Sequence, residues 1–198
     1  MNVILPTDRE GVELRELTIA NAAEYFDAVD NSRAHLREFE PGTEKKYRTL
    51  EDVEKSFEDQ DPTKVRFGIY ADDQFVGTVN LRDHGPEARV GYWVDARYTS
   101  RGFATLGAVA ITEYAIDAGF KRVEAEVIPE NTASLRVLEK AGYREFARID
   151  AAVGLEVCAE GVEPTDWSMY DHQEMWDAIL IDTVLEQIQE LRSPNSTS

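Results

Sequence analysis

The stretch RVEAEVIPENTASLRVLEKAGY, residues 122–143, carries three local signals in succession. Apolar and charged residues alternate over 123–128, which predicts a half-buried strand. Asn131 is suited to cap a helix predicted over 132–141, and Gly142 is suited to stop it. The stretch therefore predicts a strand, a short loop and a helix.

Elements of the same kinds precede this stretch. A long, largely buried helix is predicted from Gly102 to about Ala118, after a strand over 89–94. Two strands over 65–70 and 75–81, joined by an acidic turn, predict a hairpin. Nearer the N-terminus we predict a strand over 12–17, a helix after Thr18, a loop or broken helix over 35–48, and a helix capped by Thr49 with Leu50, Val53 and Phe57 as its apolar stripe.

The order of these elements predicts one α/β domain over residues 1–192, with a mixed sheet flanked by helices. Beyond Tyr143 we expect two strands, the second near 174–180, and then a terminal helix from Asp182. Residues 193–198 are polar and are predicted to form a flexible tail.

The chain of 198 residues is strongly acidic, with a net charge of −18 from 39 Asp and Glu against 21 Lys and Arg. The acidic residues are spread along the chain rather than gathered in a tail. Nonspecific binding to nucleic acid or to an anionic membrane is therefore not expected, because phosphate would be repelled. Scarce lysine with abundant acid indicates adaptation to high salt, and an ordinary acidic protein is the alternative.

Other features bear on location and metal content. No apolar run is long enough for a transmembrane helix, and the first ten residues lack the pattern of a signal peptide. The lone Cys158 excludes an internal disulfide. The three histidines and this cysteine form no cluster with metal-ligand spacing. We therefore expect a cytoplasmic protein without a bound metal.

Residues 91–105, GYWVDARYTSRGFAT, lead from a strand through a loop to the start of a helix. The first N–H groups of a helix have no partner within it, so such an end binds phosphate well. Gly102 and Ala104 would let the backbone approach a ligand closely, and Arg101 adds positive charge. The alternative is a plain strand–helix turn in which the small residues serve packing.

Together, these two segments resemble the RimJ/RimL-like branch of the GNAT superfamily, the ribosomal-protein N-terminal acetyltransferase type. Residues 122–143 are similar to the strand–loop–helix motif of that branch, and residues 91–105 to its acetyl-CoA motif. The resemblance spans roughly residues 10–146. It implies a single GNAT-type domain with a mixed, mostly antiparallel central sheet, and an enzyme with acetyl-CoA as cosubstrate.

The resemblance also implies where acetyl-CoA binds. Backbone amides at the start of the long helix would hold the pyrophosphate, and two strand residues would pair with the pantetheine arm. The implied cofactor-binding residues are Trp93, Val94, Arg101, Gly102, Phe103, Ala104, Thr105 and Asn131. Thr99 stands where the family usually has Arg or Gln, a departure that Arg101 could offset. On the acceptor side, His35 and Arg37 resemble the family's substrate segment.

Direct transfer to an amine needs a base for the amine proton and an acid for the leaving thiolate. Many family members use a helix tyrosine as the acid, but Leu138 occupies that position, so the resemblance implies Ser134 instead. Ser134 could alternatively bond only its own backbone. Glu126 is the candidate base. Glu124 shares its face of the strand, so either or both could meet the amine, or both could be solvated carboxylates.

The predicted function is transfer of an acetyl group from acetyl-CoA to a primary amine, first of all a protein N-terminal amine such as that of a ribosomal protein. A lysine side chain or a small amine (polyamine, amino sugar or antibiotic) is the alternative acceptor. A non-catalytic module that only binds acetyl-CoA is a second hypothesis, because Arg89, Thr99 and Leu138 depart from the family pattern. A homodimer is left open.

Overall fold

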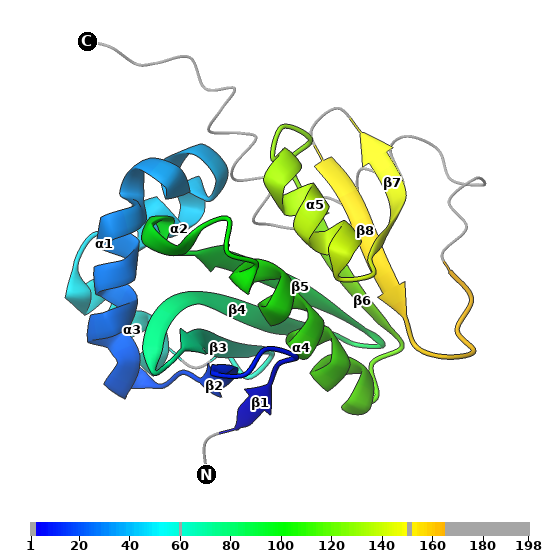
Figure 1. Cartoon of the computed structure of the whole chain (residues 1–198), viewed down its shortest axis with the longest axis horizontal. Coiled ribbons are helices and arrows are strands. Elements are labelled where there is room, and N and C mark those ends of the chain that lie inside the picture. Colours follow the sequence, from blue (N-terminus) through cyan, green and yellow to red (C-terminus); the bar gives the residue numbers. More distant parts are fainter. Residues whose placement is uncertain (1–2, 60, 150–151, 165–198) are drawn as a thin grey trace.

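An eight-stranded sheet runs through the computed structural model of the chain, which describes residues 3–59, 61–149 and 152–164 (Figure 1). The strand order is β1-β2-β3-β4-β5-β6-β8-β7. The strands are β1 (Ile4–Pro6), β2 (Val12–Glu16), β3 (Lys64–Ala71), β4 (Gln74–His84), β5 (Glu87–Val94), β6 (Arg122–Val127), β7 (Arg144–Ile149) and β8 (Ala152–Cys158).

Neighbouring strands are antiparallel with one exception, which confirms the mixed, mostly antiparallel sheet. β5 and β6 are parallel and pair only through Glu87–Arg89 and Arg122–Glu124. Within the described residues, the β5 edge that faces β6 therefore has no strand partner from Val90 onward. The sheet opens between these two strands, and this opening positions the site.

Helices cover both faces of the sheet (Figure 1). On one face, α4 packs over β4, β5 and β6, and α5 packs over β6; on the other, α1 packs against β4 and carries α2 and α3. The helices are the short η1 (Ile19–Asn21), α1 (Ala22–Phe39), α2 (Pro41–Lys46), α3 (Leu50–Glu58), the short η2 (Ala96–Tyr98), α4 (Phe103–Asp117) and α5 (Thr132–Lys140).

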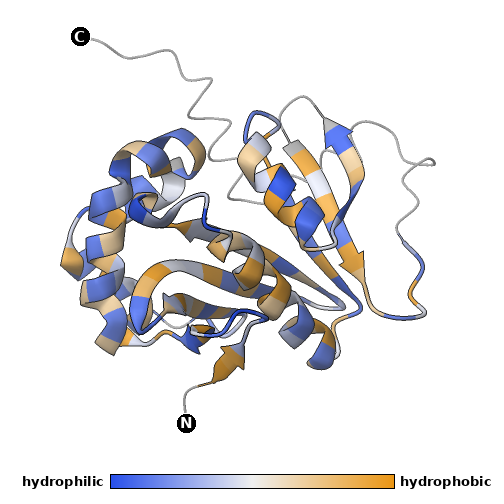
Figure 2. Ribbon diagram, viewed as in Figure 1, coloured by the Kyte–Doolittle hydropathy of each residue, from blue (hydrophilic) through white to orange (hydrophobic). Residues whose placement is uncertain are grey.

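Each face of the sheet has its own apolar core. Phe67, Ile69 and Ile111 are fully buried in the core under α4. Tyr25 and Trp93 belong to the second core, under α1 and α3. The α4 ribbon is accordingly more hydrophobic than that of α1, whose polar side faces solvent (Figure 2). None of the helices in the described part of the chain is long and apolar enough to cross a membrane.

The predicted elements up to residue 143 are confirmed, including the caps at Thr49 and Asn131. For 35–48 the broken-helix alternative is right, because α1 continues to Phe39 and α2 begins at Pro41, a residue suited to a first helical turn. Leu50 is exposed, so its predicted place in the apolar stripe of α3 is wrong.

The sheet continues after residue 143 with the hairpin of β7 and β8. β8 was not predicted, and it pairs with β6 from Val153 to Cys158. The strand predicted over 174–180, the helix from Asp182 and the tail 193–198 lie outside the described residues.

Candidate active site

A groove of about 540 Å³ runs past the N-terminus of α4. Gly102 caps this helix with a φ of +83°, a left-handed conformation that favours glycine. The first N–H groups of a helix lack internal partners, so this end of the groove suits a phosphate group. Of the predicted cofactor-binding residues, all but Arg101 line the groove: Trp93, Val94, Gly102, Phe103, Ala104, Thr105 and Asn131.

The helix α5 forms the opposite wall of the groove. Asn131 caps α5 through its Oδ1, which accepts a hydrogen bond from the Ser134 N–H at 3.0 Å. This cap leaves the side-chain NH₂ of Asn131 for other partners. Arg136 and Lys140 also line the groove, and they bring positive charge to it in a chain of net charge −18. The groove therefore combines a helix end, an unpaired strand edge and cations, as a long phosphorylated ligand requires.

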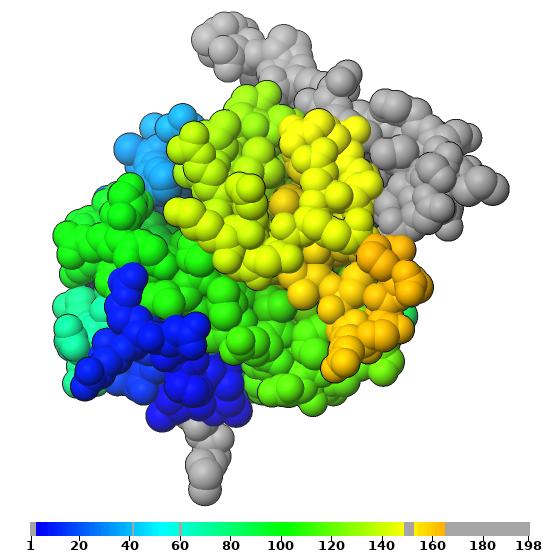
Figure 3. All heavy atoms as spheres, turned by 45° about the vertical axis from the view of Figure 1, so that its right-hand side comes forward, coloured from blue at the N-terminus to red at the C-terminus, as the bar shows by residue number. Residues whose placement is uncertain are grey.

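Arg9 reaches the same end of α4 from the turn between β1 and β2. In Figure 3 the N-terminal segment (blue) lies against the green part of the surface, which includes α4. The Nη1 of Arg9 donates to the Arg101 carbonyl at 2.9 Å, and its guanidinium lies 5.5 Å from the centre of the Phe103 ring. The Arg101 side chain instead contacts Tyr98 and the Arg97 carbonyl. Positive charge at this helix end therefore comes from Arg9 as well.

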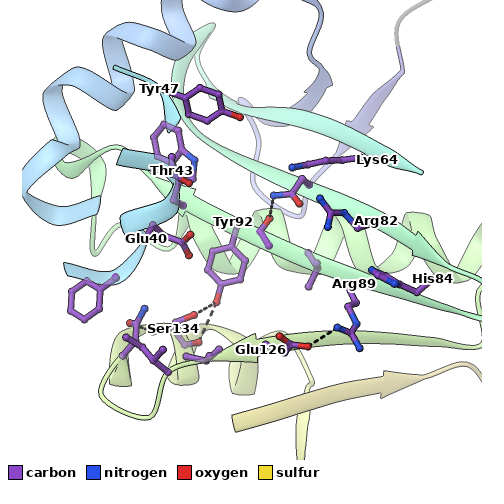
Figure 4. A pocket seen from close by; sticks show the side chains of 18 of the residues that line it. Glu40, Thr43, Tyr47, Lys64, Arg82, His84, Arg89, Tyr92, Glu126 and Ser134 are labelled. Atoms are coloured by element: carbon purple, nitrogen blue, oxygen red, sulfur yellow. Dashed lines mark hydrogen bonds and ion pairs between the residues drawn. The ribbon is translucent and has the colours of Figure 1, made fainter. Parts of the chain in front are cut away.

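A second cavity, of about 240 Å³, lies on the α1 side of the opening (Figure 4). It extends over β3, β4, β5 and β6, with Lys64, Arg82, Arg89 and Glu126 among its lining residues. The cavity and the groove share six lining residues, which mark where they meet: Phe39, Glu40, Tyr92, Trp93, Asn131 and Ser134. A ligand in the groove and a ligand in the cavity can therefore touch at this point.

Two hydroxyl groups occupy the meeting point. The Tyr92 OH lies 2.8 Å from the Ser134 Oγ and also donates to the Ser134 carbonyl at 3.2 Å. Figure 4 shows the Tyr92 side chain directed from β5 to the start of α5. Burial raises the pKa of Tyr92, an effect that the Ser134 hydrogen bond opposes, so the phenol is protonated at neutral pH. The pair can donate a proton to a leaving group.

Two carboxyl groups face the cavity. Burial raises the pKa of Glu126 to about 7, although Arg89 lowers it through an ion pair of 2.7 Å. Burial likewise raises the pKa of Glu40, at the junction of α1 and α2, to about 7, with Lys64 opposing. A carboxyl group with such a pKa can accept a proton near neutral pH. Glu124, on the same face, is bound to Arg89 at 3.5 Å and lies outside the cavity lining.

The two residues predicted on the acceptor side, His35 and Arg37, do not line the cavity. His35 lines the groove and packs edge-on against Phe39, with ring centres 5.5 Å apart. Arg37 is exposed and forms an ion pair with Glu44 at 3.2 Å, outside the lining of groove and cavity. In the described part of the chain, no group of acidic, histidine or cysteine side chains is arranged to hold a metal ion.

Tyr92 and Glu40 received no role from the sequence. Tyr92 stands inside the Gly91–Asp95 strand motif, where an aromatic residue is ordinarily a core residue. Glu40 precedes Pro41 in a segment with mixed local signals. The absence of a helix tyrosine, with the fully buried Leu138 in its place, was the signal that another hydroxyl had to supply the acid.

A comparison with known families identifies the family of the chain. The family model described as "Acetyltransferase (GNAT) domain" matches residues 12–144, which include the groove, the cavity and both motifs. The chain therefore belongs to the GNAT acetyltransferase family and is an acetyl-CoA-dependent N-acetyltransferase.

Individual relatives agree with this assignment. The probable N-acetyltransferase YjcK of Bacillus subtilis (strain 168) is 29% identical over 146 residues, which cover 68% of this chain and 81% of that protein. Among solved structures, the ribosomal alpha-N-protein acetyltransferase RimL in complex with coenzyme A superposes with a TM-score of 0.69 at 17% identity, covering 81% of this chain and all (100%) of that one. RimJ of Mycobacterium smegmatis, with CoA-disulfide, gives 0.67 at 20% identity, covering 96% and 94%. The fold is thus of the RimJ/RimL type.

Proposed function

We propose that this acetyltransferase modifies the N-terminal amine of a protein. The observation that carries the proposal is the junction of the groove with the cavity at Tyr92 and Ser134, because the cavity continues from there across the sheet to Lys64 on β3. Paired strands lie about 4.8 Å apart and β5 and β6 diverge here, so the path from β6 to β3 is at least about 14 Å long. That length accommodates roughly four residues of extended chain.

The proposed arrangement places acetyl-CoA in the groove. The N-terminus of α4 would hold the pyrophosphate, and the unpaired edge of β5 at Trp93 and Val94 would pair with the pantetheine arm. The Asn131 NH₂ group would donate to the same arm. The thioester would then reach the junction, where Tyr92 and Ser134 lie.

The chemistry proposed for the junction is direct transfer. The amine forms a C–N bond with the acetyl carbonyl carbon, its proton passes to Glu126, and the C–S bond breaks. The sulfur leaves as a thiolate and takes a proton from the Tyr92–Ser134 pair. The raised pKa of Glu126 suits proton acceptance near neutral pH, and that of Tyr92 keeps the phenol protonated.

Two structural neighbours also support a protein acceptor, since RimL is a ribosomal L7/L12 alpha-N-protein acetyltransferase and the Vibrio fischeri protein is a ribosomal-protein-S5-alanine acetyltransferase. A test is release of free CoA thiol with four acceptors at equal concentration: a lysine-free peptide with a free N-terminus, the same peptide N-acetylated and carrying one lysine, a polyamine and an amino sugar. We expect kcat/KM for the first to exceed the others at least tenfold. Preference for either small amine would overturn the protein acceptor but leave the acetyltransferase assignment intact.

A further inference from the structure

Three cationic side chains form a row across neighbouring strands in the wall of the cavity. Lys64 on β3 pairs in register with Arg82 on β4, and Arg82 with Arg89 on β5. Residues that are directly opposite project from the same face of a sheet, and like charges in such positions are destabilising. All three residues line the cavity. Such a row needs negative charge nearby.

Elsewhere along the same row, the chain supplies this negative charge itself. Arg89 is bound to Glu126 at 2.7 Å and to Glu124 at 3.5 Å. Further along, the fully buried Glu156 on β8 is paired with Arg122 at 2.9 Å and also with Arg144. The charges of β6, β7 and β8 are therefore matched by partners within the protein.

Lys64 and Arg82 are different, because neither side chain forms a hydrogen bond or an ion pair with any residue that the structure describes. Burial, followed by the charges of Arg66 and Arg82, lowers the pKa of Lys64 to about 8, although Asp61 opposes. In Figure 4 the two side chains lie on neighbouring strands, on the side of the cavity away from Glu40 and Glu126. The position between them suits an anion.

His84 provides a second, independent observation at the same cavity. It follows Arg82 on β4 by two residues and lines the same cavity. Its Nε2 is buried and has no hydrogen-bond partner in the described part of the chain. Buried polar atoms are ordinarily paired, so this nitrogen indicates a polar group that enters the cavity.

We propose that the acceptor carries an anionic group, which binds between Lys64 and Arg82 while its amine lies beside Tyr92. The inference rests on the proposed function and adds a substrate class to it. Arg89 and Tyr92 are three residues apart on β5, or about 10 Å at about 3.3 Å per residue, and the position between Lys64 and Arg82 lies about one and a half strand spacings from Arg89, which makes the separation from Tyr92 about 12 Å. An extended peptide covers this distance with an Asp or Glu side chain on its third or fourth residue, whereas the carboxylate of a free amino acid lies too close to its amine.

The test uses neutral, alanine-rich peptides with a free N-terminus, in which one glutamate moves from the second to the fifth residue. Glutamine at each place is the matched control, and salt is kept near 0.1 M, where the Debye length is about 10 Å. We expect kcat/KM to favour glutamate over glutamine at least tenfold at the third or fourth residue. Arg82→Gln and Lys64→Gln should each reduce this preference to less than threefold.

Lys121→Gln is the matched control variant, since Lys121 is exposed and outside both groove and cavity and its loss changes the net charge equally. It should keep the full preference. Calorimetry of the same peptides on the CoA-saturated protein repeats the comparison without catalysis. Equal binding and equal kcat/KM for glutamate and glutamine at all four places would overturn the anion site, with the proposed function intact. Glutamate-selective binding without acetylation of any peptide would keep the site and overturn the N-terminal acceptor.

Discussion

The Tyr92 and Ser134 hydroxyls differ in how well they suit proton donation to a thiolate. A phenol has an ordinary pKa of about 10 and a thiol about 8.5. Burial raises the pKa of Tyr92, but an aliphatic hydroxyl is less acidic still, so the phenol is the better matched acid. Ser134 holds that phenol by a 2.8 Å contact from the first turn of α5. We therefore assign the donor role to the pair, with Tyr92 as the group nearer the required pKa.

Tyr92→Phe removes only the hydroxyl of the pair. We expect kcat to fall tenfold or more, because proton transfer by a positioned group contributes about 10²–10⁴-fold, while acetyl-CoA affinity stays within about threefold. Ser134→Ala should lower kcat as well, and the double variant should lose less than the product of both single losses. Stopped-flow release of CoA thiol and calorimetry with acetyl-CoA give the two quantities.

Tyr143→Phe is the matched control for this change. The Tyr143 hydroxyl is buried against Thr112 Oγ1 at 2.7 Å, in the core under α4 rather than at the junction. That variant should keep kcat within about twofold even if it is less stable. If Tyr92→Phe also keeps kcat within twofold, the pair is structural.

The raised pKa of Glu126 gives a prediction for pH dependence. Below about 7 the carboxyl group is protonated and cannot accept the amine proton, and an N-terminal amine is itself protonated below about 8. The plot of log kcat/KM against pH should therefore approach a slope of two below pH 7 in the wild type. In Glu126→Gln it should have a slope of one, because only the amine still titrates.

Glu40→Gln serves as the comparison in the pH experiment, because burial raises the pKa of Glu40 to the same value of about 7. It should keep the slope of two. A slope of two in Glu126→Gln together with a slope of one in Glu40→Gln would move the base to Glu40.

At the scale of elements, the N-terminus of α4 is the proposed phosphate site, and Gly102 gives it its shape. A Cβ at Gly102 would lie 3.2 Å from Arg9 Nη2, and its φ of +83° is strained for any other residue. Gly102→Asp would add this strain and place a negative charge where phosphate is expected. We predict at least tenfold weaker binding of acetyl-CoA by calorimetry, about 1.4 kcal/mol or more.

Gly119→Asp separates the loss of the site from backbone strain. Gly119 follows the other end of α4, has a φ of +101° and has open space around its Cβ position. The Gly119→Asp variant should be less stable than the wild type but should bind acetyl-CoA with the same affinity. Equal affinity in a folded Gly102→Asp variant would remove the phosphate site from this helix end.

Local signals predicted most elements because turns and caps are encoded within a few residues, as at Asp72–Asp73 and Thr49. The opening between β5 and β6 could be expected only through the family resemblance, since strand pairing depends on distant residues. The strand β8 also depends on distant residues. Its Glu156 can be buried because Arg122 and Arg144, on neighbouring strands, neutralise its charge. The cofactor groove was therefore predictable from two motifs, whereas Glu40, Lys64 and Arg82 meet only in the folded cavity.

At the scale of the whole molecule, the net charge of −18 makes the folded state repel itself. We propose that the protein is adapted to high salt, so that stability and activity rise together up to molar KCl. Screening shortens the Debye length from about 10 Å at 0.1 M to about 3 Å at 1 M. The thermal midpoint and the initial rate between about 0.1 and 3 M KCl test this proposal, and a flat or falling midpoint above about 0.5 M refutes it.

One measurement addresses the transfer at the Tyr92–Ser134 junction most directly. The enzyme and acetyl-CoA are incubated with a lysine-containing peptide that has a free N-terminus and a glutamate at its third residue, and fragmentation mass spectrometry locates the acetyl group. We predict one acetyl group on the α-amine, at a rate that Tyr92→Phe lowers tenfold or more and Tyr143→Phe leaves unchanged. Acetylation of the lysine side chain alone, or an equal rate in Tyr92→Phe, would contradict the proposed reaction at this site.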